Sequence, residues 1–465
     1  MQENDNARLR ELSTMPVGRL LWRYSLPAIT GMLVMSLYNI IDRIFIGQGV
    51  GPEAIAGLAI TFPVMNLSAA LGVLIGAGGS ARISILLGAG DSQRAQRTLG
   101  NALVTLSCII VVYLTCFALF IDEILVAFGA SPEILPYARD FMMYILPGMF
   151  MTNFAFTFNN FMRVTGYPIK AMVTMFIGAG VNIILAPVFI FLLGWGIKGA
   201  AIATDIAMAV SAVFVMRHFF DPRSNLRFER SAAMYRPSLS VIWGIVAIGA
   251  APSLVNAAAC FINVLINKNL YLYGGFQAVA AAGIFTSFTS LMTMVVVGLC
   301  QGMQPIIGYN FGAGRFDRLR RTYWLSVAAA TVVVSFGTVT GLSVPQYIGM
   351  AFTTDATLIS ETGRCLSIAM RAFFVVGFQV VSTTLMQSLG KAGASVILSL
   401  ARQVIFLIPL LIILPPRYGL DGVWASFPLS DICATVLTVI MVAYTLRRIR
   451  AMESARSVEI LDPAV

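Results

Sequence analysis

The chain has 465 residues, of which 58% are hydrophobic and only 11% are charged. A soluble domain carries about 25% charged residues, so this composition excludes an ordinary water-soluble protein. The net charge is +10 at pH 7, but the basic residues lie in short connections between apolar runs. We interpret them as setting membrane topology, and we expect no nucleic-acid partner.

The apolar runs predict twelve membrane-spanning helices in an all-α polytopic protein. About 20 apolar residues cross a hydrocarbon core of about 30 Å, because a helix rises about 1.5 Å per residue. The expected spans are 20–46, 54–80, 99–121, 140–162, 171–193, 198–219, 241–267, 278–304, 322–345, 366–388, 393–414 and 420–446. The start of the chain is polar and mixed in charge, unlike a cleavable signal peptide.

The first span carries the sharpest functional candidate, Asp42, in the run YNIIDRIFIG. A charged residue at the centre of a bilayer costs about 2.5–3.5 kcal/mol, so it is a functional candidate by default. Pro27 lies fifteen residues earlier, where it removes a backbone hydrogen bond and allows a bend. We predict that Asp42 binds a proton or Na⁺ in the outer half of the span. The alternative is an interfacial pair with Arg43.

The fourth to sixth spans add polar candidates. Asn153 is one of several uncharged polar residues expected to line a cleft. Asn182 places an amide inside the run VNIILAPVFI, although an interhelical hydrogen bond would also explain it. Asp205 follows Thr204 and is a second possible cation ligand. Its alternative is a partly solvated carboxylate that faces another helix.

The longest polar connection, 217–240, separates two halves of six spans each. We therefore predict two lobes joined by a cytoplasmic linker. The expected organisation is an N-terminal cytoplasmic segment 1–19, an N-lobe 20–219, a linker 220–240, a C-lobe 241–446 and a cytoplasmic tail 447–465.

The second half carries charges of both signs at membrane depth. Asp431 lies in the last span, while Arg371 and Arg402 lie in the two spans before it. A structural Asp–Arg pair is the plain interpretation, and a role of Arg371 and Asp431 in gating or substrate polarity is the alternative. The other cleft candidates of this half are uncharged: Asn256, Gln304 and Gln379.

Motifs typical of metal-binding, nucleotide-binding or catalytic sites are absent from the sequence. The chain has one histidine, and none of its six cysteines forms a CxxC pair, so we predict no metal centre beyond a possible Na⁺. The GAG runs at 88–90 and 312–314 are not followed by a Lys and a Ser or Thr, as a phosphate-binding loop requires. We expect no cofactor and no enzymatic activity, and an ion gradient as the energy source.

A repeated run supports the two-lobe plan. LLGAGDSQRAQRT at 86–98 returns as NFGAGRFDRLRRT at 310–322. Six spans per half means that both halves enter the membrane from the same side, so the pseudo-twofold axis should run along the membrane normal. Alignment of Pro27 with Pro252 places Asp42 opposite Asn267. We therefore expect cation coupling in the N-lobe, with the C-lobe completing the cleft.

Basic residues also predict the orientation. With the N-terminus inside, 23 of the 31 lysines and arginines fall on the cytoplasmic side. This asymmetry favours cytoplasmic termini, because positively charged loops stay inside. We expect a monomer in the bacterial cytoplasmic (inner) membrane, with both termini on the cytoplasmic side.

Several stretches together carry a family resemblance. They are YSLPAITGMLVMSLYNIIDRIFIGQ, the GAG…RAQRT loop, NNFMRVTGYP, VNIILAPVFI, GWGIKGAAIAT, QGMQPIIGYNFGAG and GLDGVWASFPLSD. Over about 16–446 the chain resembles the multidrug and toxic compound extrusion transporters, in the bacterial branch that includes a staphylococcal multidrug exporter. The resemblance implies two six-helix lobes, a central cleft, and export of amphipathic, often cationic drugs or toxic metabolites in exchange for H⁺ or Na⁺.

The same resemblance implies a coupling site. In related proteins it combines a first-span carboxylate, a fifth-span Asn, an acid four residues later and a sixth-span Thr, which correspond here to Asp42, Asn182, Ala186 and Thr204. The alanine departs from this pattern and favours H⁺ over Na⁺. We hypothesise that Asp205 supplies the missing carboxylate.

Two other functions compete with drug export. A flippase for a lipid-linked substrate would share the two-lobe plan, and the three intramembrane arginines are a mild hint toward it. It should show a strongly basic cleft for a diphosphate. A membrane receptor or enzyme is the third possibility, but an enzyme would need a paired nucleophile and base, which the sequence does not offer.

Overall fold

The computed structural model describes residues 9–50, 52–222, 224–229 and 231–461, and over these ranges the chain is helical with no strand. The elements of the first half are α2 (Val17–Gly49), α3 (Pro52–Gly88), α4 (Ser92–Leu119), α5 (Ile121–Ala127), α6 (Leu135–Val164), α7 (Pro168–Pro187), the π-helical turn η1 (Val188–Leu192) and α8 (Gly196–Phe220).

A short helix, α9 (Ala232–Tyr235), lies in the connection to the second half. The elements of the second half are α10 (Leu239–Gly312), α11 (Phe316–Ser343), α12 (Pro345–Met350), α13 (Ala356–Ala369), the 3₁₀ turn η2 (Met370–Val375), α14 (Val376–Ser388), α15 (Ala392–Leu400), the π-helical turn η3 (Ala401–Leu407), α16 (Ile408–Ile413) and α17 (Pro415–Leu461).

Eleven helices of the described chain are long and apolar enough to cross a membrane. One of them, α10, has 74 residues, and a straight helix of that length would measure about 110 Å. Gly275 interrupts it with a φ of 65° and a ψ of −160°, a backbone conformation that favours glycine. Because Gly275 lies between the predicted spans 241–267 and 278–304, α10 supplies two crossings. The prediction of twelve spans in an all-α membrane protein is confirmed.

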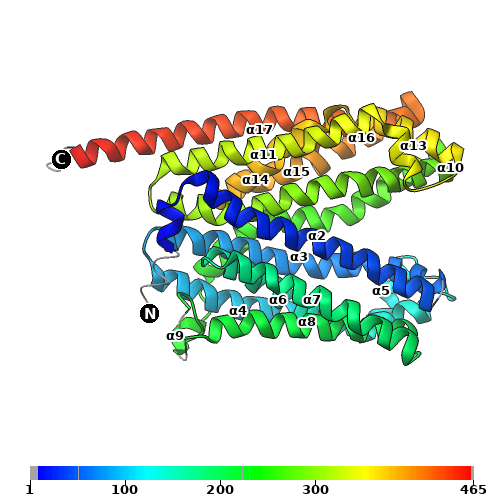
Figure 1. Ribbon diagram of the computed structural model, residues 1–465, viewed down its shortest axis with the longest axis horizontal. Coiled ribbons are helices and arrows are strands. Elements are labelled where there is room, and N and C mark those ends of the chain that lie inside the picture. Colours follow the sequence, from blue (N-terminus) through cyan, green and yellow to red (C-terminus); the bar gives the residue numbers. More distant parts are fainter. Residues whose placement is uncertain (1–8, 51, 223, 230, 462–465) are drawn as a thin grey trace.

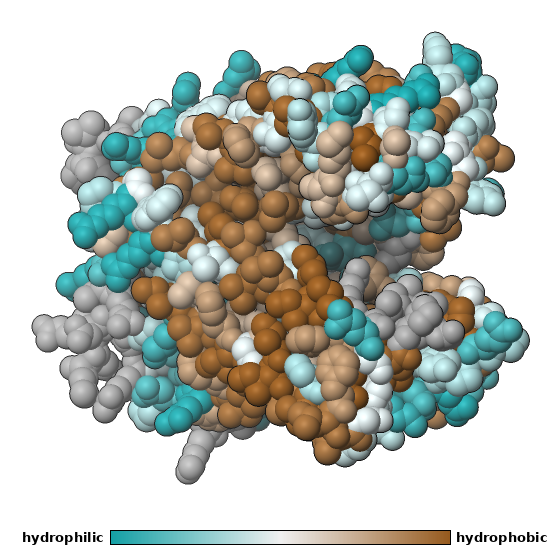
Figure 2. Space-filling model, turned by 45° about the vertical axis from the view of Figure 1, so that its right-hand side comes forward, coloured by the Kyte–Doolittle hydropathy of each residue, from teal (hydrophilic) through white to brown (hydrophobic). Residues whose placement is uncertain are grey.

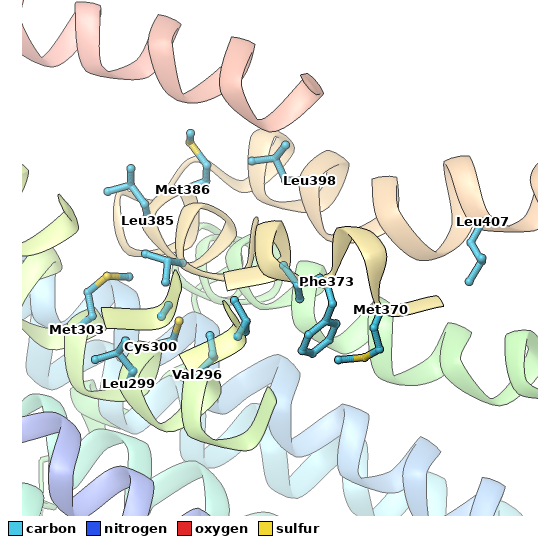
Figure 3. Packing of buried hydrophobic residues seen from close by; sticks show 14 of the residues in the cluster. Val296, Leu299, Cys300, Met303, Met370, Phe373, Leu385, Met386, Leu398 and Leu407 are labelled. Carbon is cyan, nitrogen blue, oxygen red and sulfur yellow. The ribbon is translucent and has the colours of Figure 1, made fainter. Parts of the chain in front are cut away.

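The crossings form two lobes (Figure 1). Helices α2 to α8 make the N-lobe, whose hydrophobic cores include Phe158 and Phe141. Helices α10 to α17 make the C-lobe, with one large core around Tyr323 and Trp424. In Figure 3, Leu299 and Met303 of α10 belong to this core, together with side chains of α14. Each lobe thus has its own packed interior.

Helix α2 changes partners along its length. Near its start, the Ser25 hydroxyl donates to the carbonyl of Leu299 on α10, at 3.3 Å. Further along, Tyr38 packs with Ala179 of α7 in the N-lobe. Pro27 lies inside the helix, buried, close to the point where these contacts change. The predicted bend-permitting proline therefore lies within the part of α2 that contacts α10, a few residues before the helix turns to the N-lobe alone.

The lobes touch closely through α3 and α10. A Cβ atom added to Gly249 of α10 would lie 1.7 Å from the carbonyl oxygen of Leu74, and one added to Gly78 of α3 would lie 1.9 Å from that of Ile245. Only glycine allows the two backbones to approach so closely. This contact lies toward the end of the molecule where the described chain starts and finishes, which we call the terminal end (Figure 1).

The opposite end of the molecule is more open. Figure 2 shows a notch between the two lobes on the side away from the terminal end, and an apolar brown surface beside it. The lobes are therefore joined at the terminal end and separated at the other. This is the arrangement of a cleft that opens to one side only.

Candidate functional site

The structure brings Asn182 and Thr204 together in the N-lobe. The Asn182 side-chain amide on α7 donates to the Thr204 hydroxyl on α8, at 3.0 Å. Tyr38 of α2 lies close enough to Thr204, and to Asp42 one helical turn further on, for electrostatic interaction with both. Tyr38, Asn182 and Thr204 thus bring three helices together, and Asp42 lies one turn beyond Tyr38 on α2. We call these four residues the N-lobe cluster. The side chain of Arg43, the alternative partner of Asp42, lies outside the described residues.

The Asn182 side chain is held in an apolar setting. Only 1% of its surface is exposed, and its carbonyl oxygen Oδ1 makes no hydrogen bond within the described chain. Ala186, one turn further along α7, is fully buried among apolar side chains. The cluster therefore offers neutral oxygens from α7 and α8 and a carboxylate from α2, but no acid from α7.

Asp205 faces a different helix. It is half-buried against Gly148 of α6, where a Cβ atom would lie 1.8 Å from the carboxylate oxygen Oδ1. Neighbouring residues point about 100° apart on a helix, so Thr204 faces α7 while Asp205 faces α6. The structure does not bring Asp205 into the contact between Asn182 and Thr204.

Two of the predicted cleft residues bond within their own lobe. Asn153 is buried between α6 and α3, where its amide donates to the Ser68 hydroxyl at 3.0 Å. Gln379 of α14 donates to the carbonyl of Asp431 at 2.6 Å and to the Thr435 hydroxyl at 2.7 Å. Both amides tie helices of one lobe together, as expected of buried polar groups in membrane proteins.

The other uncharged candidates lie elsewhere. The Gln304 amide of α10 donates to the carbonyl of Ala77 on α3, at 3.4 Å, so it joins the two lobes near the glycine contact. Asn256 is exposed and donates to the carbonyl of Pro252 on its own helix, at 3.0 Å. None of these bonds places a side chain in a shared pocket with the N-lobe cluster.

An ion pair is present in the C-lobe. The Arg402 guanidinium Nε lies 2.7 Å from the Asp431 carboxylate, with 32% of the arginine side chain exposed and 4% of the aspartate side chain. Arg371 is not part of it, since this exposed residue donates to the carbonyl of Ser367 on its own helix, at 3.0 Å. The predicted Asp–Arg pair therefore forms with one of the two candidate arginines.

This ion pair lies on a cavity of about 570 Å³. Aromatic rings form part of its wall, among them Phe373, which Figure 3 shows beside Met370. The amides of Asn263 and Asn267 also line it. Of the six predicted cleft residues, Asp431 alone is on this wall. The volume is within the range of about 300–1,000 Å³ that is typical of small-molecule sites.

Two residues of these sites, Tyr38 and Arg402, were not among the site residues predicted from the sequence. Tyr38 had no signal beyond its position one turn before Asp42, and its contact with Thr204 depends on how α2 packs. Arg402 did have a signal, since a charge at membrane depth marks a functional candidate. Within the described residues, no group of three His, Cys, Asp or Glu side chains could hold a metal ion.

Both halves of the chain match the model of a known protein family. The MatE family model matches residues 27–188 and again residues 252–413. The two matched segments begin at Pro27 and at Pro252, one in each half of the chain. The duplication seen in the sequence is thus a repeat of this family unit.

The chain is also similar to individual proteins along nearly its full length. It is 27% identical to "Multidrug export protein MepA" of Staphylococcus haemolyticus over 448 residues, which are 95% of this chain and 96% of that protein. It is also 27% identical to MepA of Staphylococcus aureus over 451 residues, which are 96% of this chain and 97% of that protein.

Solved structures share the fold. A MATE structure in a bent conformation gives a TM-score of 0.89 at 23% identity, covering 96% of this chain and 99% of that chain. An outward-facing multidrug resistance MATE transporter gives 0.87 at 24% identity, covering 95% and 98%. The two-lobe architecture is therefore the one these proteins have.

Proposed function

Because this chain belongs to the MatE family, whose model matches both of its halves, we propose that it is a membrane exporter of small molecules. The observation that carries this proposal is the similarity to multidrug export proteins along 95% of the chain. We infer that its substrates are amphipathic, often cationic drugs or toxic metabolites. It moves them by alternating access of a cleft between the lobes.

Coupling to a cation is the second part of the proposal. Asp42 is the carboxylate that takes up the cation, and Asn182 and Thr204 are its neutral neighbours; their convergence with Tyr38 supports this assignment. A single carboxylate can carry a proton, whereas a metal cation needs several oxygen ligands. Since α7 offers Ala186 where an acid would complete such a set, we propose H⁺ as the coupling ion.

Asp205 is the second carboxylate of the proposed coupling system. Its position against α6 supports a separate titrating group rather than a shared ligand. Efflux measured against Na⁺ and against pH should therefore differ between wild type and Asp205→Asn, with a shallower pH dependence in the variant. Coupling identical to wild type would remove Asp205 from the proposal.

The alternating-access cycle would use the change of partners along α2. The part around Pro27 contacts α10 of the C-lobe, from Ser25 to Met32, and the part from Tyr38 onward belongs to the N-lobe cluster. Proline weakens the helix at this point, so protonation of Asp42 could be relayed to the lobe contact by a bend. The basic loops support cytoplasmic termini in the bacterial inner membrane, and we propose that the protein acts as a monomer.

The lipid flippase has less support. It would need several cations in the cleft for a diphosphate group. Arg402 is the single basic residue among the described residues that line the C-lobe cavity, and Arg371 bonds to the carbonyl of Ser367, one turn earlier. No observation favours this second function over export.

Efflux of a cationic dye tests the proposal. Wild type, Asp42→Asn and Asp140→Asn are expressed to equal levels in a bacterium that lacks its own pumps, and ethidium accumulation is followed. Asp140 is a suitable control, because it undergoes the same chemical change at an exposed pair with Lys198. We expect wild type and Asp140→Asn to lower accumulation, and Asp42→Asn to behave like the empty vector.

Two results would contradict this. If wild type exports no cationic dye at any pH, the export function fails. If Asp42→Asn exports as fast as wild type, export stands but the coupling assignment fails. Equal loss in both variants would show a general loss of folded protein, which quantification of purified, monodisperse protein would reveal.

A further inference from the structure

The C-lobe cavity presents one accessible charged group to its interior. Among the described residues on its wall, Arg402 is the only basic one and Asp431 the only acidic one. The arginine side chain is 32% exposed, against 4% for the aspartate. A molecule that enters the cavity would therefore meet the guanidinium, with the carboxylate behind it.

The Arg402 guanidinium has N–H groups that make no hydrogen bond within the described chain. Its Nε faces Asp431 at 2.7 Å, and neither of its two terminal nitrogens donates to any residue that the structure describes. Arginine presents its N–H groups in a planar fork that fits the two oxygens of a carboxylate. The terminal nitrogens of Arg402 thus have the chemistry of an anion-binding group.

Local backbone structure places this arginine. Arg402 and Gln403 lie in the π-helical turn η3, and such wide turns are frequent at functional sites. The Ser430 hydroxyl of α17 donates to the carbonyl of Arg402 and so fixes the turn. The Gln403 oxygen Oε1 is buried and has no partner within the described chain. Both side chains belong to the cavity wall.

The rest of the wall suits the apolar body of a ligand. Phe285 and Phe427 lie with their ring centroids 5.4 Å apart, and Phe373 adds a third ring. Asn267 holds the position that corresponds to Asp42 in the N-lobe, so a neutral amide lines the C-lobe where the N-lobe has an acid. Among the residues that the structure describes on this wall, Asp431 is the one carboxylate that an anion would meet.

We propose that the C-lobe cavity is a binding site for amphipathic molecules that carry a carboxylate, which Arg402 holds while the aromatic wall receives the apolar body. This inference rests on the proposed function, since it names the group that would bind the acid of those exported compounds that carry one. It assigns opposite tasks to the two lobes. The N-lobe takes up the coupling cation, and the C-lobe recognises an anionic group of the substrate.

Binding to the purified, full-length protein in lipid nanodiscs tests the proposal without any transport step. The probes are a rhodamine dye with a free carboxylate and the methyl ester of the same dye, which share the ring system and differ in the acid. Fluorescence anisotropy gives the affinity of each. We compare wild type with the double variant Arg402→Gln, Asp431→Asn, which removes both charges and leaves no unpaired buried ion.

We expect the double variant to lose about tenfold or more in affinity for the acid, the usual effect of removing a charged hydrogen bond, and to keep its affinity for the ester within about twofold. Asp431→Asn alone keeps the arginine, so it should bind the acid at least as tightly as wild type. Arg417→Gln, an exposed arginine at the start of α17, should leave both affinities unchanged.

Three results would overturn the site. They are an unchanged acid affinity in the double variant, an equal loss for acid and ester, and a loss in Asp431→Asn as large as in the double variant. Failure of export is distinguishable, because the probe affinities are measured without a gradient. If cells expressing the wild type fail to export ethidium while Arg402-dependent acid binding persists, the proposed function fails and the binding site stands.

Discussion

At the scale of single residues, the N-lobe cluster depends on one hydroxyl. The Thr204 hydroxyl accepts from Asn182 at 3.0 Å and donates to the carbonyl of Ala200 at 3.0 Å, and Tyr38 lies nearby. Because Asn182 is almost completely buried, its amide has no water to replace this partner. The position of the candidate coupling site is thus set by a threonine that carries no charge.

Replacing this hydroxyl should cost both stability and transport. Thr204→Val keeps the side-chain shape and leaves the Asn182 amide buried without its partner, which costs about 1–3 kcal/mol. We expect a lower thermal unfolding temperature of the purified protein and slower dye efflux. Thr204→Ser retains the hydroxyl and should stay near wild type in both measurements. Equal behaviour of the two variants would show that the hydroxyl is unimportant.

At the scale of elements, the contact between α3 and α10 joins the lobes. Gly249 and Gly78 bring the two backbones together, and Gln304 and Gln387 donate to the carbonyl of Ala77 beside them. A transporter that alternates between two states must break such a contact in each cycle. Glycines and long hydrogen bonds therefore suit this contact between α3 and α10 better than a large apolar interface would.

A single methyl group should disturb the contact between α3 and α10. In Gly249→Ala the new Cβ would lie 1.7 Å from a backbone oxygen of α3, so the helices must separate. We expect faster labelling of a cysteine placed at the terminal end of the cleft, and reduced efflux, because the closed state of that end is destabilised. Gly180→Ala in α7 is the matched control, since nothing lies within 4 Å of its added Cβ. Labelling at the wild-type rate in Gly249→Ala would mean that this contact does not close the cleft.

At the scale of the whole molecule, the two lobes share a fold but differ in charge. The N-lobe holds Asp42 and Asp205 at membrane depth, whereas the C-lobe holds the Arg402–Asp431 pair on a cavity. The lobes meet at the terminal end and are separated at the other (Figures 1 and 2). If the terminal end is cytoplasmic, as the basic loops predict, this arrangement is open to the outside.

Reporter fusions test that orientation. Green fluorescent protein attached after the C-terminus should fluoresce, and alkaline phosphatase at the same place should be inactive, because each reporter works on one side of the membrane only. The connection 128–134 before α6 is at the other end of the fold, so a phosphatase inserted there should be active. The reversed pattern would place the termini outside and invert the direction of the proposed export.

Much of the architecture follows from local properties of the sequence. Apolar runs of about 20 residues must form helices in a bilayer, because backbone groups have no water to bond with there. The repeated GAG run and the paired prolines then predict two equivalent lobes. Two connections between spans are exceptions, because each is little more than a kink at one glycine: Gly275 in α10 and Gly419 in α17. Hydropathy locates the apolar runs, but it does not show how few residues can connect two of them.

The candidate sites were only partly predictable. By itself, the sequence determined the membrane setting, the duplication and the identity of the rare charges, because these depend on composition and periodicity. Only the tertiary structure decided that Asn182 meets Thr204, that Asp205 faces α6 instead, and that Arg402 rather than Arg371 pairs with Asp431. The physical reason is that a helical side chain's partner depends on the rotation and packing of its helix, which are set by contacts between residues far apart in the chain.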